Sequence, residues 1–246
     1  MKSETKCDVK QGVDNVKNID NLIADLGKKN MITHARARSC LVAIGEHAVG
    51  PLVRALSNHN SRVRWEASKT LDEINIDWTK HADATTINAL VNDLASKDGF
   101  VRVRARRALV AINGKAINTL VKALSSKKTW LRWEAAKALC EIGDPAATQA
   151  LINALEDKEF DVRWLAAEGL ITIGRPALIP VLRLLVERSD SLWLREAGHR
   201  FLHGLDKRGL ENILQPVLNA LEEPESQLEV PIAAEAALQK LPPEQP

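Results

Sequence analysis

Apolar residues recur along the chain in a pattern that repeats about every 31 residues. The clearest copy is Val63–Ile74, which is apolar at its positions 1, 5, 9 and 12. Positions spaced in this way share one face of an α-helix, so each copy is predicted to be an amphipathic helix, here called a first-type helix. The leucines at position 9 of successive copies are Leu41, Leu71, Leu109, Leu139, Leu170, Leu202 and Leu238.

A second amphipathic segment, typified by Gly50–Leu56, alternates with the first and is here called a second-type helix. Its last leucines show the same period and are Leu26, Leu56, Leu94, Leu124, Leu155, Leu185 and Leu221. A tight turn follows the first-type helix, best seen at residues 143–145, where Gly ends one helix and Pro starts the next. Because the two series of leucines share one period, the chain is predicted to be a tandem array of repeats whose helix pairs stack to form a core.

The V-R-W-x-A-A-x-x-L-x-x-I-G runs and the G-D-P turn at 143–145 resemble the HEAT-like repeats named after phycobilisome lyases. The resemblance implies an all-α fold, a right-handed α-solenoid of about seven stacked antiparallel helix pairs, whose second-type helices line the concave face. We expect a single repeat domain over residues 15–241, with insertions near 75–84 and 205–229. Residues 1–14 and 242–246 are predicted to be disordered.

The near-neutral net charge of +2 hides a strongly uneven distribution. Residues 97–137 hold eleven basic and two acidic residues, a local charge of +9, whereas residues 66–93 carry −4 and residues 141–161 carry −5. Such a basic patch attracts anionic partners through its local field, unless its charges pair with the acidic neighbours. The candidate residues of this patch are Arg102, Arg104, Arg106, Arg107, Lys127, Lys128 and Arg132.

Two further patterns are candidate binding surfaces. Trp65, Trp133 and Trp164 all occupy position 3 of first-type helices. One interpretation is an apolar ridge that binds a partner, and the other is that each ring covers the side chain one turn later on its own helix. Amide and basic residues recur on the polar face of the second-type helices. They are interpreted either as hydrogen-bonding groups for a partner or as a face that is simply solvated by water. The members of this stripe are Arg54, Asn88, Asn92, Asn118, Lys122, Gln149, Asn153 and Arg183.

Arginine occupies position 2 in five of the seven first-type copies. In HEAT-like arrays such an arginine often pairs with an acidic residue in the turn of a neighbouring repeat, and here Asp144 is the one acid at the expected place. The alternative is a set of arginines available to an anionic ligand. The five residues are Arg64, Arg102, Arg132, Arg163 and Arg195.

No catalytic constellation is recognisable, so we expect no catalytic residue, no metal and no cofactor. His199 and His203 have a spacing that suits a metal, but no third ligand is recognisable beside them. Deoxyhypusine hydroxylases are HEAT-like arrays with paired His-Glu motifs, whereas the adjacent pair here is reversed, Glu46-His47. The chain has no Gly-rich phosphate loop and no nucleophile elbow. Cys7, Cys40 and Cys140 are predicted to be free thiols.

These features favour a non-catalytic scaffold that holds an acidic or extended protein partner on its concave face and basic patch. A nucleic-acid-binding protein, or a HEAT-like DNA glycosylase acting through residues 97–137, is the alternative. A bilin lyase-like protein is a third hypothesis, which the name of the resembling family suggests. The absence of an apolar leader or long apolar window predicts a cytoplasmic protein without a membrane span. The oligomeric state stays open.

Overall fold

The computed structural model describes residues 14–74 and 76–241, with side chains from residue 18 onward. All regular structure in these ranges is helical, without strands, and the protein is an all-α solenoid as predicted. The expected disordered segments lie outside the described residues, except for Asp14, which begins α1. Two compact units, residues 1–119 and 120–246, divide the chain within α7 (Gly114–Leu124).

The helices of each unit alternate between the second and first types. The first unit contains α1 (Asp14–Leu26), α2 (Met31–Ile44), α3 (Val49–Leu56), α4 (Ser61–Glu73), α5 (Ala84–Asp93) and α6 (Gly99–Ile112). The second unit contains α8 (Thr129–Ile142), α9 (Thr148–Ala154), α10 (Phe160–Ile173), α11 (Leu178–Glu187), α12 (Leu192–Gly204), α13 (Glu211–Glu222) and α14 (Ser226–Lys240). Short 3₁₀ turns are η1 (Gly45–Ala48), η2 (Trp78–His81), η3 (Pro145–Ala147) and η4 (Arg175–Ala177).

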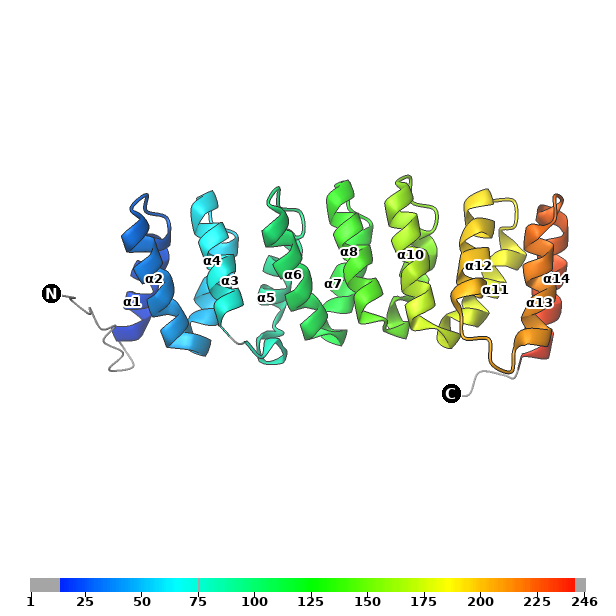
Figure 1. Ribbon diagram of the computed structural model, residues 1–246, viewed down its shortest axis with the longest axis horizontal. Coiled ribbons are helices and arrows are strands. Elements are labelled where there is room, and N and C mark those ends of the chain that lie inside the picture. The colour runs from blue at the N-terminus through cyan, green and yellow to red at the C-terminus, as the bar shows by residue number, and fades with distance from the viewer. Residues whose placement is uncertain (1–13, 75, 242–246) are drawn as a thin grey trace. The chain divides into compact units, whose positions relative to one another are not determined.

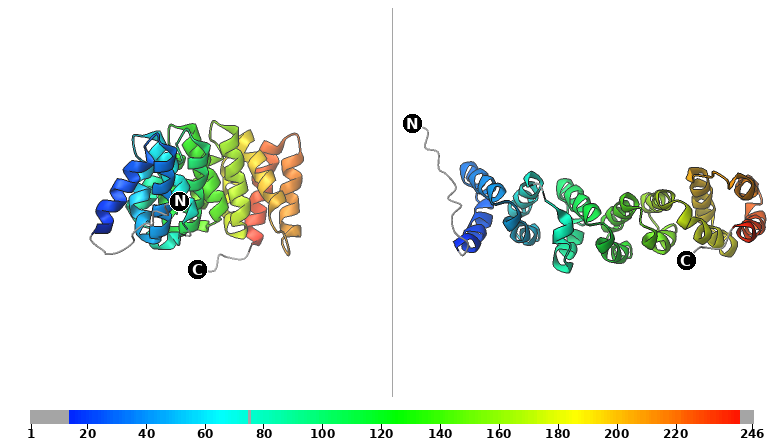
Figure 2. Two further views of the ribbon diagram at one scale, coloured as in Figure 1. Left: turned by 60° about the vertical axis from the view of Figure 1, so that its left-hand side comes forward. Right: turned by 90° about the horizontal axis from the view of Figure 1, so that it is seen from below.

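Apart from α8, which follows the unit boundary in α7, each first-type helix packs against the second-type helix that precedes it. In the first unit, α2, α4 and α6 form one layer and α1, α3 and α5 form the other (Figures 1 and 2). In the second unit, α10 packs on α9, α12 on α11 and α14 on α13. Because an amphipathic pair leaves an apolar face on each side, stacking of pairs buries a continuous core within each unit.

The repeated apolar positions form this core. Position-9 leucines Leu41, Leu109 and Leu202 are 0% exposed, and the alanines of position 5, such as Ala67 and Ala135, are also 0% exposed. The small alanines allow the helices to approach closely. Leu238 is the exception, because it lies half-exposed on the last described helix, where no further pair covers it.

Local signals in the loops set the helix ends. Asn60 and Asp98 are N-caps, and their side chains accept hydrogen bonds from the backbone N–H of Arg62 at 3.0 Å and of Phe100 at 2.9 Å. Gly143 ends α8 in the left-handed conformation with φ of 65°, the backbone state that the G-D-P turn requires. The expected insertion at 75–84 contains η2, which Asp77 caps.

The cysteines differ from the expectation of three free thiols. Cys40 is disulfide-bonded, so the prediction is wrong at this position. Cys140 is a free, half-buried thiol, and burial raises its pKa. Cys7 lies outside the described residues.

One described stretch, Met31–Leu56, is long and apolar enough to cross a membrane by composition alone. The pair Phe160–Ile173 and Arg175–Glu187 passes the same test together but is bent by 116°. The first stretch consists of α2, η1 and α3, and its Leu41, Leu52 and Leu56 are at most 3% exposed. These leucines lie in the interior of the solenoid, whereas Met31 and Ile32 at the start of the stretch are 73% and 80% exposed.

Candidate functional site

All eight residues of the predicted amide-and-basic stripe are solvent-exposed. Their neighbours on the same helices are buried: on α9, Leu151 is 0% and Ile152 is 5% exposed. Gln149 Nε2 donates to Asn153 Oδ1 at 3.2 Å, which leaves further donor and acceptor positions of both amides facing solvent. The first unit holds Arg54, Asn88, Asn92 and Asn118, and the second holds Lys122, Gln149, Asn153 and Arg183.

The position-2 arginines bond to the backbone of the loop before their own helix. Each guanidinium donates from Nη1 to the carbonyl oxygen six residues earlier, at 2.7–2.8 Å in four of the five copies. The arginines thus hold the loop that joins each helix pair, and Asp144, the expected turn acid, instead caps η3 by accepting from the backbone N–H of Ala146 at 2.8 Å. The pairs are Arg64 with Asn58, Arg102 with Ser96, Arg132 with Ser126, Arg163 with Asp157 and Arg195 with Ser189.

Arg132 makes an additional buried ion pair with the next loop. Its Nε and Nη2 donate to the two carboxylate oxygens of Asp157 at 2.7 and 3.0 Å, and the two side chains are only 7% and 10% exposed. Burial opposes ionisation of Asp157, but the hydrogen bonds from Arg132 hold its pKa below the ordinary range. This bidentate pair joins successive helix pairs of the second unit.

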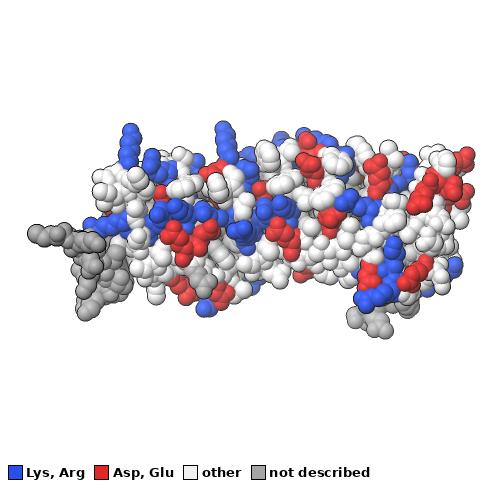
Figure 3. Space-filling model, in the orientation of Figure 1, with Lys and Arg blue, Asp and Glu red and all other residues white. Residues whose placement is uncertain are grey.

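The residues of the predicted basic patch are divided between the two units. Besides Arg102 and Arg132, Arg104 pairs with Asp72, and Arg106 is only 8% exposed. Figure 3 shows basic and acidic side chains lying beside one another on this face of the first unit. Much of the +9 segment thus serves the protein's own contacts, and three of its seven candidate residues are exposed: Arg107, Lys127 and Lys128.

The position-3 tryptophans carry cations over their rings. The ammonium groups of Lys69 and Lys137 lie 5.2 Å and 4.9 Å from the ring centroids of Trp65 and Trp133, as the covering interpretation expects. Trp164 differs, because its ring is covered by Arg200 of α12 at 4.8 Å rather than by a residue of its own helix.

A groove with a volume of about 570 Å³ opens in the second unit among α10, α12 and α13. Aromatic rings from two helices form its wall, and guanidinium groups lie across them. The Arg163 guanidinium carbon lies 4.2 Å from the centroid of Trp193, and the Arg200 guanidinium is held by Glu168 at 2.6 Å. Its aromatic lining residues are Phe160, Trp164 and Trp193.

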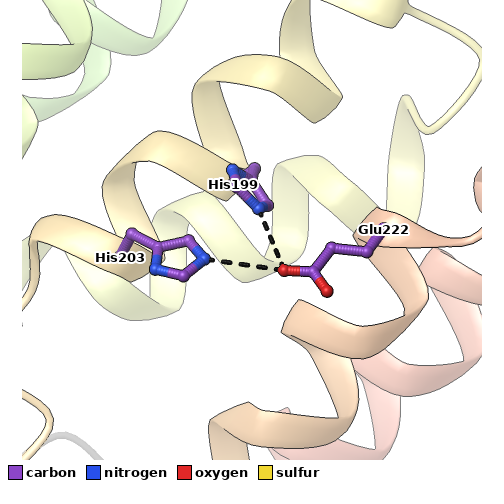
Figure 4. A group of neighbouring side chains, drawn as sticks. All are labelled: His199, His203 and Glu222. Carbon is purple, nitrogen blue, oxygen red and sulfur yellow. Dashed lines mark hydrogen bonds and ion pairs between the residues drawn. The ribbon is translucent and has the colours of Figure 1, made fainter.

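His199 and His203 lie at one end of this region on α12, together with Glu222 of α13 (Figure 4). Their Nε2 atoms lie 3.5 Å and 3.8 Å from Glu222 Oε1, and the two imidazole centroids are 4.4 Å apart. The three ligand atoms lie within 4.8 Å of one another. His199 and Glu222 also line the groove.

Sequence reasoning found the histidine pair but missed its third member. Glu222 follows His203 by 19 residues on another helix, and the packing of α13 on α12 brings them together. Nothing in the sequence singles out Glu222 among the acids near the end of the chain. Trp193 was missed because it stands one position before the repeat pattern of α12 begins.

Comparisons with known proteins agree with the helical array. A family model described as HEAT repeats matches residues 87–161 and 117–202. No curated protein matches the chain. Among solved structures, an archaeal HEAT-like repeats protein from Thermococcus onnurineus is 15% identical, with coverage of 89% of this chain and 98% of that one and a TM-score of 0.48. A complex of CpcE and CpcF of phycocyanin lyase from Nostoc is 22% identical, with coverage of 77% and 98% and a TM-score of 0.32. Human deoxyhypusine hydroxylase is 18% identical, with coverage of 76% and 96% and a TM-score of 0.39.

Proposed function

We propose that this chain, which belongs to the HEAT-like repeat family, is a non-catalytic scaffold that binds an acidic or extended protein segment through its amide-and-basic stripe. The observation that carries the proposal is the exposure of all eight stripe residues on helices whose other faces are buried. Within each unit, amides and cations on successive second-type helices offer hydrogen-bonding positions to an extended backbone and to carboxylates.

The basic patch contributes less to this proposal than its charge suggests. Arg102, Arg104 and Arg132 are engaged with loop carbonyls or carboxylates of the protein itself. The exposed Arg107, Lys127 and Lys128 remain available to attract an acidic partner. The same engagement reduces the support for phosphate binding along residues 97–137.

The stripe is tested with two variants used as bait in affinity purification from the native cell, followed by mass spectrometry. The stripe variant combines Asn118→Ala, Lys122→Ala and Asn153→Ala, all exposed positions on second-type helices. The control combines Arg62→Ala and Asp161→Ala, exposed charged positions on the first-type helices α4 and α10. We expect proteins that wild type and control capture to be lost with the stripe variant.

An equal set of captured proteins with all three baits would contradict the stripe as the binding surface. Nuclease treatment of the lysate separates direct protein partners from those bridged by nucleic acid. If the captured material is nuclease-sensitive and duplex binding in a gel-shift falls steeply with salt, the nucleic-acid alternative replaces the proposal.

A further inference from the structure

The separation between the two imidazoles and Glu222 is too long for good direct hydrogen bonds. Such N–H···O bonds are typically about 2.7–3.2 Å between heavy atoms, whereas the Nε2–Oε1 distances here are 3.5 Å and 3.8 Å. Ligand atoms held about 2.0–2.1 Å from a tetrahedral zinc ion are about 3.4 Å apart. These two separations are thus close to that of ligands arranged around one cation, and all three ligand atoms lie within 4.8 Å of one another.

The backbone places the three side chains beside one another. His199 and His203 are one helical turn apart on α12, so both rings project from the same face. Glu222 comes from the last turn of α13, which packs on α12. In Figure 4 the two rings converge on the same carboxylate oxygen.

We propose that His199, His203 and Glu222 bind one divalent cation of the zinc class. Two imidazoles and one carboxylate are the donor set that zinc and neighbouring late first-row metals accept. The side chains are 40%, 51% and 62% exposed, which leaves outward coordination positions to water. Since His199 and Glu222 line the groove, the cation lies at its edge.

A bound cation joins α12 to α13 through three side chains. Because the unfolded chain does not hold these ligands together, binding stabilises the folded second unit. The proposal therefore has two readouts, the binding of the metal itself and the melting temperature. Neither readout depends on the partner proposed above.

The test uses the full, untagged chain and zinc chloride as the probe. Isothermal titration calorimetry is expected to show one zinc equivalent per chain, with a rise in melting temperature on zinc addition. Loss of a group that only hydrogen-bonds to a metal ligand typically lowers metal affinity by about 10-fold or more, and loss of a ligand itself costs at least as much. His203→Asn and Glu222→Gln are therefore each expected to weaken zinc binding by at least about 10-fold. Because both side chains are exposed, these substitutions leave the core intact.

His81→Asn is the matched control, since His81 Nε2 lies 3.7 Å from Glu46 Oε1 in a similar histidine–carboxylate pair. His81 belongs to no group of three possible ligands within the described residues. This variant is expected to bind zinc as the wild type does. The absence of saturable binding, or unchanged affinity in both His203→Asn and Glu222→Gln, would overturn the proposal. An equal loss in His81→Asn would do so as well.

Discussion

Trp65 of the first unit and Trp164 of the second occupy the same position of their helices, yet different residues cover their rings. In α4, Lys69 one turn later lies over Trp65 at 5.2 Å. In α10, the equivalent residue is Glu168, and it instead binds Arg200 of α12 at 2.6 Å. Arg200 then lies over Trp164 at 4.8 Å.

The difference arises from a reversal of charge at one repeated position. A lysine there completes a contact within its own helix, whereas a glutamate draws an arginine from the next first-type helix. The reversal builds one wall of the groove that ends at His199 and Glu222. In this array, a local departure from the repeat therefore creates a distinct surface while the core positions stay the same.

The groove of the second unit and the cavity of the first unit also differ in their lining. The groove of the second unit is open and lined by aromatic rings, whereas a cavity of about 260 Å³ in the first unit has Asp93 among its lining residues. Asp93 is 6% exposed, and its Oδ2 has no hydrogen-bond partner among the described residues. Burial raises its pKa from 3.8 to about 7, against the opposing charge of Arg64.

Asp93→Asn is expected to give the largest effect. Between about pH 4 and 7 the folded protein keeps a proton on Asp93 that the unfolded chain has released, so the free energy of unfolding falls as pH rises through this window. Asparagine removes this dependence, and at pH 8 the variant is expected to be more stable, on the order of 4 kcal/mol from the size of the shift. Chemical denaturation at pH 4, 6 and 8 measures the free energy of unfolding of the wild type and of the variant. Arg104 and Arg107, which also line the cavity, stay the same in both proteins.

Asp190→Asn serves as the control, because its side chain is 84% exposed. It is expected to change stability by no more than about 0.5 kcal/mol at each pH. Equal pH dependence of the wild type and Asp93→Asn would show that the carboxyl of Asp93 is not the buried titrating group.

Asp157→Ala is expected to destabilise the second unit by about 3 kcal/mol, because it leaves the buried guanidinium of Arg132 without its carboxylate. The comparable change in the first unit is Asp72→Ala, which removes the partner of Arg104. Its side chain is 44% exposed, so we expect a loss of at most about 1 kcal/mol. Urea unfolding of both variants measures the contrast, and losses of equal size would rule out burial as its cause.

Gly198→Ala tests a close approach of two helices in the second unit. A Cβ at this position would lie 2.8 Å from Leu185 Cδ2, so the packing of α12 on α11 must shift. The expected loss is about 1–3 kcal/mol. Gly50→Ala in α3 is the matched change in the first unit, where the nearest atom is Arg54 Nη1 at 3.8 Å. We expect it to be neutral or slightly stabilising, and thermal melts of the pair check the difference.

The repeat made the core of this protein predictable, because position-5 and position-9 residues such as Ala67 and Leu109 follow directly from helical periodicity. The contacts of the arginines were not predictable in the same way. Arg132 bonds both its own loop and Asp157 of the next, and charge alone does not distinguish a carbonyl from a carboxylate as the partner. Glu222 lay beyond sequence reasoning, since only the packing of α13 on α12 places it beside the histidines.

The smallest expected effect returns to the two tryptophans. A double-mutant cycle with Trp164→Leu and Arg200→Ala is expected to give a coupling energy of about 0.5–1 kcal/mol, the usual size for an exposed cation–π pair. In the background Glu168→Lys, α10 has the same charge at this position as α4, and repulsion drives Arg200 away. The Trp164–Arg200 coupling is then expected to fall to about zero, while a Trp65–Lys69 cycle in the same background keeps its value. Persistence of the Trp164–Arg200 coupling in that background would mean that packing of α12, rather than the carboxylate of Glu168, positions the guanidinium.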